Sequence, residues 1–226
     1  TEASMPELSQ LTHDEVRMLG CLIEKQVTTP DYYPLTLNAL STAASQKSNR
    51  DPVMHFTDED VVVALDGLRH KGLAEQVTTA GSRVPKYAHT MPRVLDLDDA
   101  ELAVLCVAML RGPQTAGELK GRTARLHPFA SPTEAEATVH RLAENEPPLM
   151  MTLLVQPGRK EPRHAHLLAG APEIDTVAPA AVAESATTAV RARQEAIEAL
   201  SDRVETLESQ LAALQAEFKE FRSLLE

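Results

Sequence analysis

Thr12-His13-Asp14-Glu15 opens a pattern of three helices followed by a β-hairpin, and the chain carries this pattern twice. A Thr hydroxyl and a Glu carboxylate three residues apart can cap each other's backbone N–H groups, which marks a helix start. Val16, Leu19 and Ile23 then follow at the spacing of one helical face. The stretch therefore predicts an amphipathic first helix.

The second copy begins at Asp98 and keeps the same order of elements. Its first helix places Leu102, Leu105 and Met109 on one face, at the spacing of the first copy. Self-similarity on this scale predicts two copies of one fold. The third helix of each copy is also amphipathic, with Val61, Leu65 and Leu68 in the first copy and Ala135, Val139 and Leu142 in the second.

Each copy ends in two strand-like segments around a turn, which is the order of a winged helix, a form of the helix-turn-helix fold. In the first copy we expect helices near residues 13–26, 35–46 and 58–71. The sequence predicts a mainly α protein with small β-hairpins, made of two tandem winged-helix domains followed by a C-terminal coiled-coil helix. The predicted parts are an N-terminal tail (1–10), a first domain (11–92), a second domain (93–170), a linker (171–188) and a coiled-coil helix (189–226).

The last part of the chain carries a heptad pattern over residues 190–225. Branched residues at several a positions and Leu at d positions favour a parallel two-stranded coil, and therefore a homodimer. In that register Arg203 faces Glu208 and Glu217 faces Arg222, which are attractive pairs. The alternative is a single amphipathic helix folded onto its own core. The expected dimer residues are Ile197, Leu200, Val204, Leu207, Leu211, Leu214, Phe218 and Phe221.

The composition limits the partners and the location. The formal net charge is -11 at pH 7, and more than half of the acidic excess follows residue 170. Such a chain repels phosphate on average, so any DNA contact must come from a local basic patch. Cys21 and Cys106 lie in apolar helices and are expected to be buried free thiols. Without a signal segment or an apolar run of about 18 residues, we expect a cytoplasmic protein with no membrane partner.

Three stretches of the first copy resemble a known family. They are residues 19–26 (LGCLIEKQ), residues 28–40 (TTPDYYPLTLNAL) and residues 46–53 (QKSNRDPV). Together they resemble the YceH-type family of uncharacterised bacterial proteins with tandem winged helices. The resemblance is specific over residues 19–54 and looser up to about residue 170. It implies the fold and no established activity.

Cations on the turns and hairpins suggest contacts with DNA phosphates. A helix-turn-helix presents the turn before its third helix to the nucleic-acid backbone, and hairpin cations suit phosphates or the minor groove. Alternatively, Arg50 pairs with Asp51, Asn49 and Arg50 tie the turn to the second domain, and the hairpin charges serve solubility. The candidate DNA-binding residues are Lys47, Asn49, Arg50, Arg83, Lys86, Lys120, Arg122, Arg125, Arg159 and Lys160.

The third helix of the first copy argues against simple DNA reading. Asp58, Glu59 and Asp60 crowd its N-terminus, where a phosphate would otherwise be attracted. The run Val61–Leu65 is apolar beyond one face. This predicts that another domain or subunit covers the outer side of the helix, unless the stripe facing the core is simply wide.

No motif of catalysis or of cofactor binding is recognisable. The chain has no Gly-rich phosphate loop, nucleophile elbow or paired-Cys zinc motif. His164 and His166 could share one face of a strand, but a third metal ligand is missing. We therefore expect no enzyme, cofactor or metal, and two functions remain. One is a dimeric DNA-binding regulator, and the alternative is an adaptor that binds an unidentified protein without binding DNA.

Overall fold

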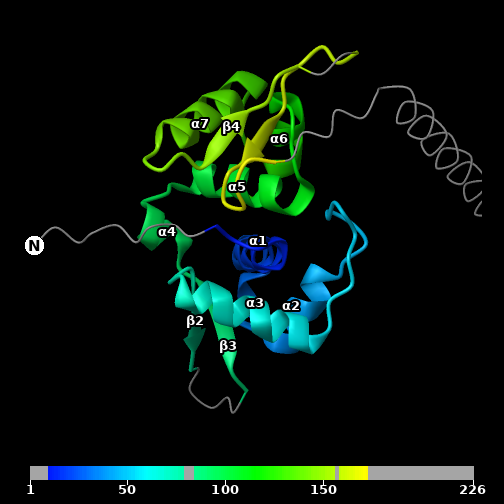
Figure 1. Cartoon of the computed structure of the whole chain (residues 1–226), viewed down its shortest axis with the longest axis vertical. Coiled ribbons are helices and arrows are strands. Elements are labelled where there is room, and N and C mark those ends of the chain that lie inside the picture. The colour runs from blue at the N-terminus through cyan, green and yellow to red at the C-terminus, as the bar shows by residue number, and fades with distance from the viewer. Residues whose placement is uncertain (1–9, 79–83, 156–157, 173–226) are drawn as a thin grey trace, which may run out of the picture. The chain divides into compact units, whose positions relative to one another are not determined.

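A computed structural model describes residues 10–78, 84–155 and 158–172 of the chain. The described part is mainly helical, with two small antiparallel sheets (Figure 1). The expectation of a mainly α protein with small β elements is therefore confirmed. Arg83, the predicted coiled coil, and nearly all of the predicted N-terminal tail and linker lie outside the described residues.

The first copy forms three helices and a hairpin, as predicted. The second helix starts two residues later than expected, because Leu35 and Thr36 pair with Tyr87 and Lys86 as a short strand. The third sheet strand thus comes from the α1–α2 connection, and the sheet order is β1-β3-β2. The elements are α1 (His13–Thr28), the 3-10 turn η1 (Pro30–Tyr32), β1 (Leu35–Thr36), α2 (Leu37–Ala44), α3 (Asp58–His70), β2 (Ala74–Val77) and β3 (Lys86–His89).

The second copy repeats the order after a short helix that the sequence analysis did not predict. That helix, α4, carries Pro92 in its first turn, where a missing N–H costs nothing. The two strands of the second hairpin are short, with three residues each. The elements are α4 (Met91–Leu95), α5 (Asp99–Arg111), α6 (Ala116–Thr123), α7 (Pro132–Glu144), β4 (Met150–Thr152) and β5 (His164–His166).

Local capping signals set the helix starts. The Thr12 hydroxyl accepts from the backbone N–H of Glu15, and the Glu15 carboxylate accepts from that of Thr12 at 2.7 Å. The same reciprocal box opens the third helix at Thr57 and the middle helix of the second copy at Thr115. These starts were readable from sequence because both partners lie within one helical turn.

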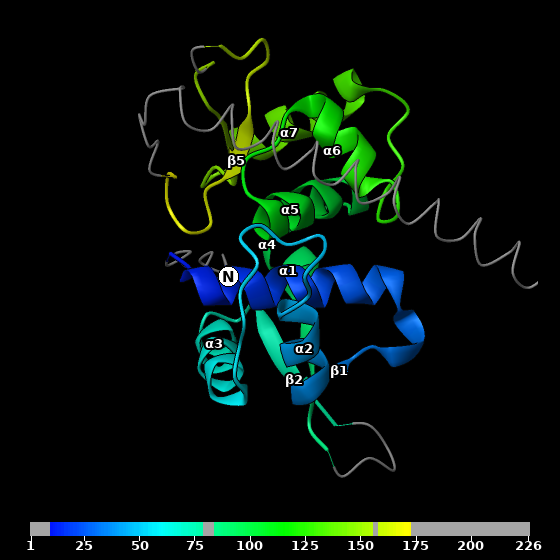
Figure 2. The ribbon, with the colours of Figure 1, turned by 90° about the vertical axis from the view of Figure 1, so that its right-hand side faces the viewer.

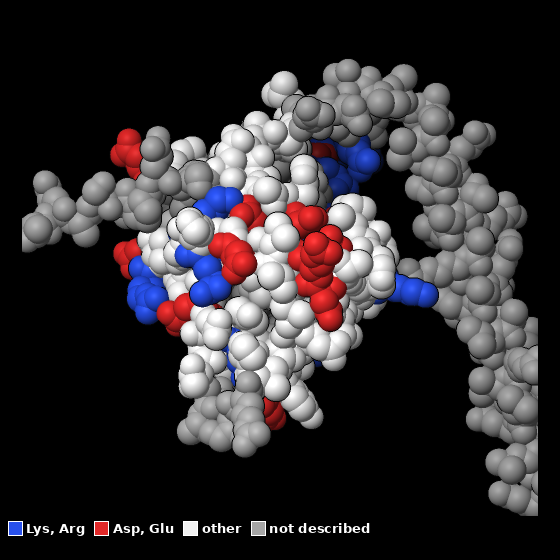
Figure 3. Space-filling model, turned by 60° about the horizontal axis from the view of Figure 1, so that its bottom comes forward, with Lys and Arg blue, Asp and Glu red and all other residues white. Residues whose placement is uncertain are grey.

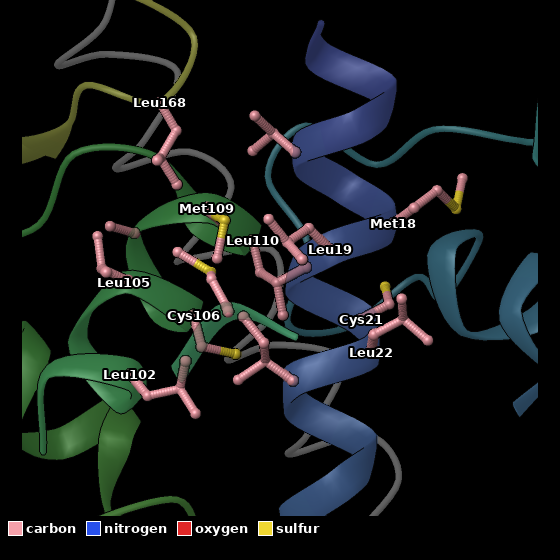
Figure 4. Close-up of a cluster of buried hydrophobic side chains, with 14 of the residues drawn as sticks. Met18, Leu19, Cys21, Leu22, Leu102, Leu105, Cys106, Met109, Leu110 and Leu168 are labelled. Atoms are coloured by element: carbon pink, nitrogen blue, oxygen red, sulfur yellow. The ribbon is translucent and has the colours of Figure 1, made fainter. Parts of the chain in front are cut away.

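The two copies pack against each other through α1 and α5 (Figures 1 and 2). Figure 4 shows Leu19 of α1 pointing toward the side chains of α5, while Met18 and Leu22 point away from α5. Gly20 permits the close approach, because a Cβ there would lie 2.9 Å from the side chain of Leu110. The buried apolar residues of both copies consequently form one hydrophobic cluster.

The predicted apolar faces are all buried. They comprise the i, i+3, i+7 residues of α1 and α5 and the i, i+4, i+7 residues of α3 and α7. Cys21 and Cys106 are buried free thiols, as expected. Within the described residues, no helix is long and apolar enough to cross a bilayer.

Candidate functional site

The segment between α2 and α3 holds Arg50 inside the protein. Both terminal nitrogens of its guanidinium donate to the Glu24 carboxylate of α1, at 2.7 Å and 3.1 Å. The Arg50 Nε donates to the backbone oxygen of Ala43 at 3.1 Å. Since its side chain is 0% exposed, Arg50 faces no phosphate in this structure.

Glu24 and Arg50 each stabilise the charged form of the other. Burial alone would raise the pKa of Glu24, but the hydrogen bonds and the charge of Arg50 outweigh it and hold the pKa below its ordinary value. Burial would likewise lower the pKa of Arg50, yet its hydrogen bonds to Glu24 raise it. Both groups are therefore charged, and removal of either would leave a buried charge without its partner.

The same segment is tied to the second copy. The backbone N–H of Asp51 donates to the backbone oxygen of Leu110 at 2.9 Å, and the Arg111 side chain donates to the Asn49 side-chain oxygen. Asn49 has φ 60°, a left-handed conformation that Asn tolerates better than most residues. Asn49 thus ties the segment to the second copy. Arg50, for which the sequence offered the same role or a pair with Asp51, instead binds Glu24 of the first copy.

The other candidate cations lie in separate places. Lys47 is exposed in the α2–α3 segment, and Lys86 is half-buried on β3. In the second copy, Arg122 pairs with Glu118 at 3.4 Å, and Arg163 of the second hairpin pairs with the same carboxylate at 3.4 Å. Within the described residues, the candidates that have no ion-pair partner are Lys47, Lys86, Lys120, Arg125, Arg159 and Lys160.

The outer face of α3 is apolar between two acidic positions. Val62 and Val63 are 42% and 68% exposed. Glu59 precedes them and Asp66 follows them, each exposed and about one helical turn away. Figure 3 shows the same feature as uncharged surface between groups of acidic side chains. We call Glu59, Val62, Val63 and Asp66 the α3 face.

The apolar run on α3 divides between the core and the surface. Val61, Ala64 and Leu65 are buried, as a wide stripe facing the core requires. Val62 and Val63 lie beyond that stripe, so the core does not explain them. This excess of apolar residues is readable from the sequence. The role of Glu24 is not, because its partner Arg50 lies 26 positions further along the chain.

The buried histidines have structural contacts. His164 Nδ1 lies 3.1 Å from the Thr152 hydroxyl, and the His164 backbone pairs with that of Gln114. His89 Nε2 lies 2.6 Å from the Gln26 side-chain oxygen, and burial lowers the pKa of His89 to about 4. Among the described residues, no three His, Cys, Asp or Glu side chains are close enough together to hold a metal ion.

A family described as "Protein of unknown function, DUF480" matches residues 11–159. The chain belongs to this family. Relatives called UPF0502 proteins include one from Geobacter sulfurreducens, 51% identical over 212 residues that cover 94% of this chain and 96% of the relative. Another, from Pelobacter propionicus, is 45% identical over 216 residues, or 96% and 98% of the two chains. A third, from Koribacter versatilis, is 49% identical over 158 residues, or 70% and 73%.

The DUF480 match spans the features described above. It begins just before α1 and ends beyond β4, so it includes the Glu24–Arg50 pair and the α3 face. The expected membership of a family of uncharacterised bacterial proteins is therefore confirmed. The names of these relatives state no activity.

Proposed function

We propose that this member of the DUF480 family is a non-enzymatic cytoplasmic adaptor that binds another protein through the α3 face. We interpret its two copies as tandem winged-helix domains, in which the third helix is the element that enters DNA in DNA-binding proteins. The observation that carries the proposal is the pair of exposed valines at this position, between Glu59 and Asp66.

The chemistry of the α3 face suits a protein better than a duplex. The first turn of α3 carries three carboxylates, those of Asp58, Glu59 and Asp60. They repel a phosphate, although the N-terminus of a helix would otherwise attract one. Val62 and Val63 offer no hydrogen bond to a base edge. A protein partner would remove both valines from water, and full burial of such a side chain contributes about 1.5–3 kcal/mol.

We further propose that the heptads of residues 190–225 join two chains in a parallel dimer, so that each assembly presents two α3 faces. Light scattering on the full chain at micromolar concentrations tests this. A full chain that stays monomeric would contradict the dimer. So would a chain truncated after Gly170 that dimerises as tightly as the full chain.

Affinity capture with three full-length baits tests the adaptor. They are the natural chain, the double variant Val62→Ser/Val63→Ser, and the control Val27→Ser/Val53→Ser, which removes two valines that are 43% and 56% exposed elsewhere. We expect the natural chain and the control to retain the same protein and the α3 variant to lose it. Retention of that protein by the α3 variant would contradict the proposal.

A DNA-binding regulator is the second candidate. It is supported by Lys120, Arg125, Arg159 and Lys160 of the second copy, which have no ion pair in the described part of the chain and could neutralise phosphates. With Arg50 held by Glu24, Lys47 is the exposed cation of the α2–α3 segment that could join them. Recovery of DNA instead of protein in the capture experiment, unchanged in the α3 variant, would favour this function.

A further inference from the structure

We propose that the α3 face binds the second hairpin of another copy of this chain. This inference rests on the proposed adaptor function and names its partner. The hairpin surface concerned consists of Leu154, Val155, Arg159 and Lys160, which we call the hairpin tip. It lies in the connection between β4 and β5.

The hairpin tip is apolar and basic. Leu154 is 86% exposed and Val155 is 50% exposed, and both come after Leu153, the residue that follows β4. Arg159 and Lys160 are exposed and make no ion pair with a described residue. Glu161 is the carboxylate beside them, so the two cations leave an excess of positive charge at the tip.

The α3 face complements the tip in both properties. Two valines can meet Leu154 and Val155, so that each apolar pair covers the other. Asp66 already pairs with Arg69 at 2.9 Å. The exposed carboxylates at the start of α3, Asp58 and Glu59, are therefore the groups that would receive Arg159 and Lys160.

The partner must be a second molecule. The hairpin of β4 and β5 and helix α3 lie on opposite sides of the packed α1 and α5 (Figures 1 and 2). One chain therefore cannot bring its own two surfaces together. Because the contact joins two different surfaces, each pair of chains still has one unoccupied α3 face and one unoccupied hairpin tip. Further chains can bind there, so the contact extends into a ring or a line. Two apolar residues a side make a small contact, of the weak and transient class.

Disulfide trapping between two full-length variants tests the contact. One chain carries Val63→Cys and the other Val155→Cys, and the natural thiols Cys21 and Cys106 are buried and do not compete. The control replaces Val63→Cys by Ala137→Cys, the exposed position of α7 that corresponds to Val63. We expect the α3 pair to cross-link on the order of tenfold faster, because the contact holds the two thiols near each other, at an effective concentration of about 1 mM.

Charge reversal makes the test specific. Asp58→Lys/Glu59→Lys in the first chain should abolish the excess rate, and Arg159→Glu/Lys160→Glu in the second chain should restore it. Circular dichroism checks that each variant folds. A rate equal to that of the Ala137→Cys control, or an excess that charge reversal leaves unchanged, would overturn the inference.

The outcomes separate this inference from the adaptor. If trapping shows no excess while capture still depends on Val62 and Val63, the α3 face binds a different protein and only the self-contact is wrong. If neither trapping nor capture depends on these valines, the adaptor proposal fails as well.

Discussion

Helices α3 and α7 are equivalent in the two copies and differ on their outer sides. Each has 13 residues. At the positions where α3 exposes Val62 and Val63, α7 carries Glu136 and Ala137. The fold therefore does not need valines on the outer side of this helix, and we expect those of α3 to serve something other than folding. The buried positions match one to one, with Val61, Ala64, Leu65 and Leu68 in α3 and Ala135, Thr138, Val139 and Leu142 in α7.

The first helices of the copies differ in a similar way. Glu24 of α1 is aligned with Leu110 of α5 when the two capping boxes are superimposed in sequence. The carboxylate of α1 receives Arg50 from the α2–α3 segment, whereas Leu110 belongs to the apolar core. The first copy therefore holds its α2–α3 segment to α1 with an ion pair. The second copy has an apolar residue, Leu110, at the position equivalent to Glu24. Four experiments can break or sharpen these comparisons.

The largest effect is expected from Glu24→Ala. Loss of this carboxylate leaves the Arg50 charge buried and unpaired, which typically costs about 3–5 kcal/mol of unfolding free energy. Arg141→Ala in the second copy removes the exposed pairs with Asp98 and Glu101 and should cost at most about 1 kcal/mol. Urea denaturation measures both. Equal costs for the two variants would show that the ion pair does not hold the first copy together.

Leu65→Ala should destabilise the protein by about 2–5 kcal/mol, because it opens a cavity at a side chain that is 1% exposed. Val63→Ser, two positions earlier, should change the free energy of unfolding by less than about 0.5 kcal/mol. Ala137→Ser on α7 is the matched control and should be equally mild. A large cost for Val63→Ser, but not for Ala137→Ser, would mean that Val63 stabilises the fold.

Much of the fold, and less of the candidate site, could be predicted from the sequence. Capping boxes and apolar spacing act within one or two helical turns, so the starts of α1, α3 and α5 and the buried faces were predicted correctly. The strand at Leu35 and the partner of Arg50 depend on residues far along the chain, and no local pattern carries that information. Glu24 could be suspected only as a carboxylate near the apolar part of α1, next to Lys25. The coiled-coil dimer and the DNA contacts stay predictions.

Acid should weaken the first copy through Glu24. Because the pKa of Glu24 is lowered in the folded protein, its contribution to stability is complete above the ordinary value of 4.5. That contribution is lost as the pH falls through the lower pKa of the folded state. Urea midpoints measured on both sides of this range should fall less steeply for Glu24→Gln than for the natural chain. Identical slopes would show that Glu24 is not the group responsible.

The smallest effect concerns DNA. If the second copy contacts phosphates, Lys120→Ala/Arg125→Ala should weaken binding to all sequences and lower the salt slope by roughly one per lost contact. Lys47→Ala is the corresponding change in the first copy, where a single contact is at stake. Binding titrations over a range of salt concentrations measure the slopes. An undiminished slope in the double variant would exclude Lys120 and Arg125 from the contact.

The packing of α1 against α5 also constrains how the protein is made. The ribosome releases α1 (His13–Thr28) long before α5 (Asp99–Arg111), yet Leu19 of α1 points toward α5 and Gly20 lies against Leu110. During synthesis the first copy can assemble its three helices while this side of α1 is still in water. An apolar helix face exposed on a nascent chain is the kind of surface that chaperones bind. The side of α1 that faces α5 can therefore be covered only after α5 has left the ribosome.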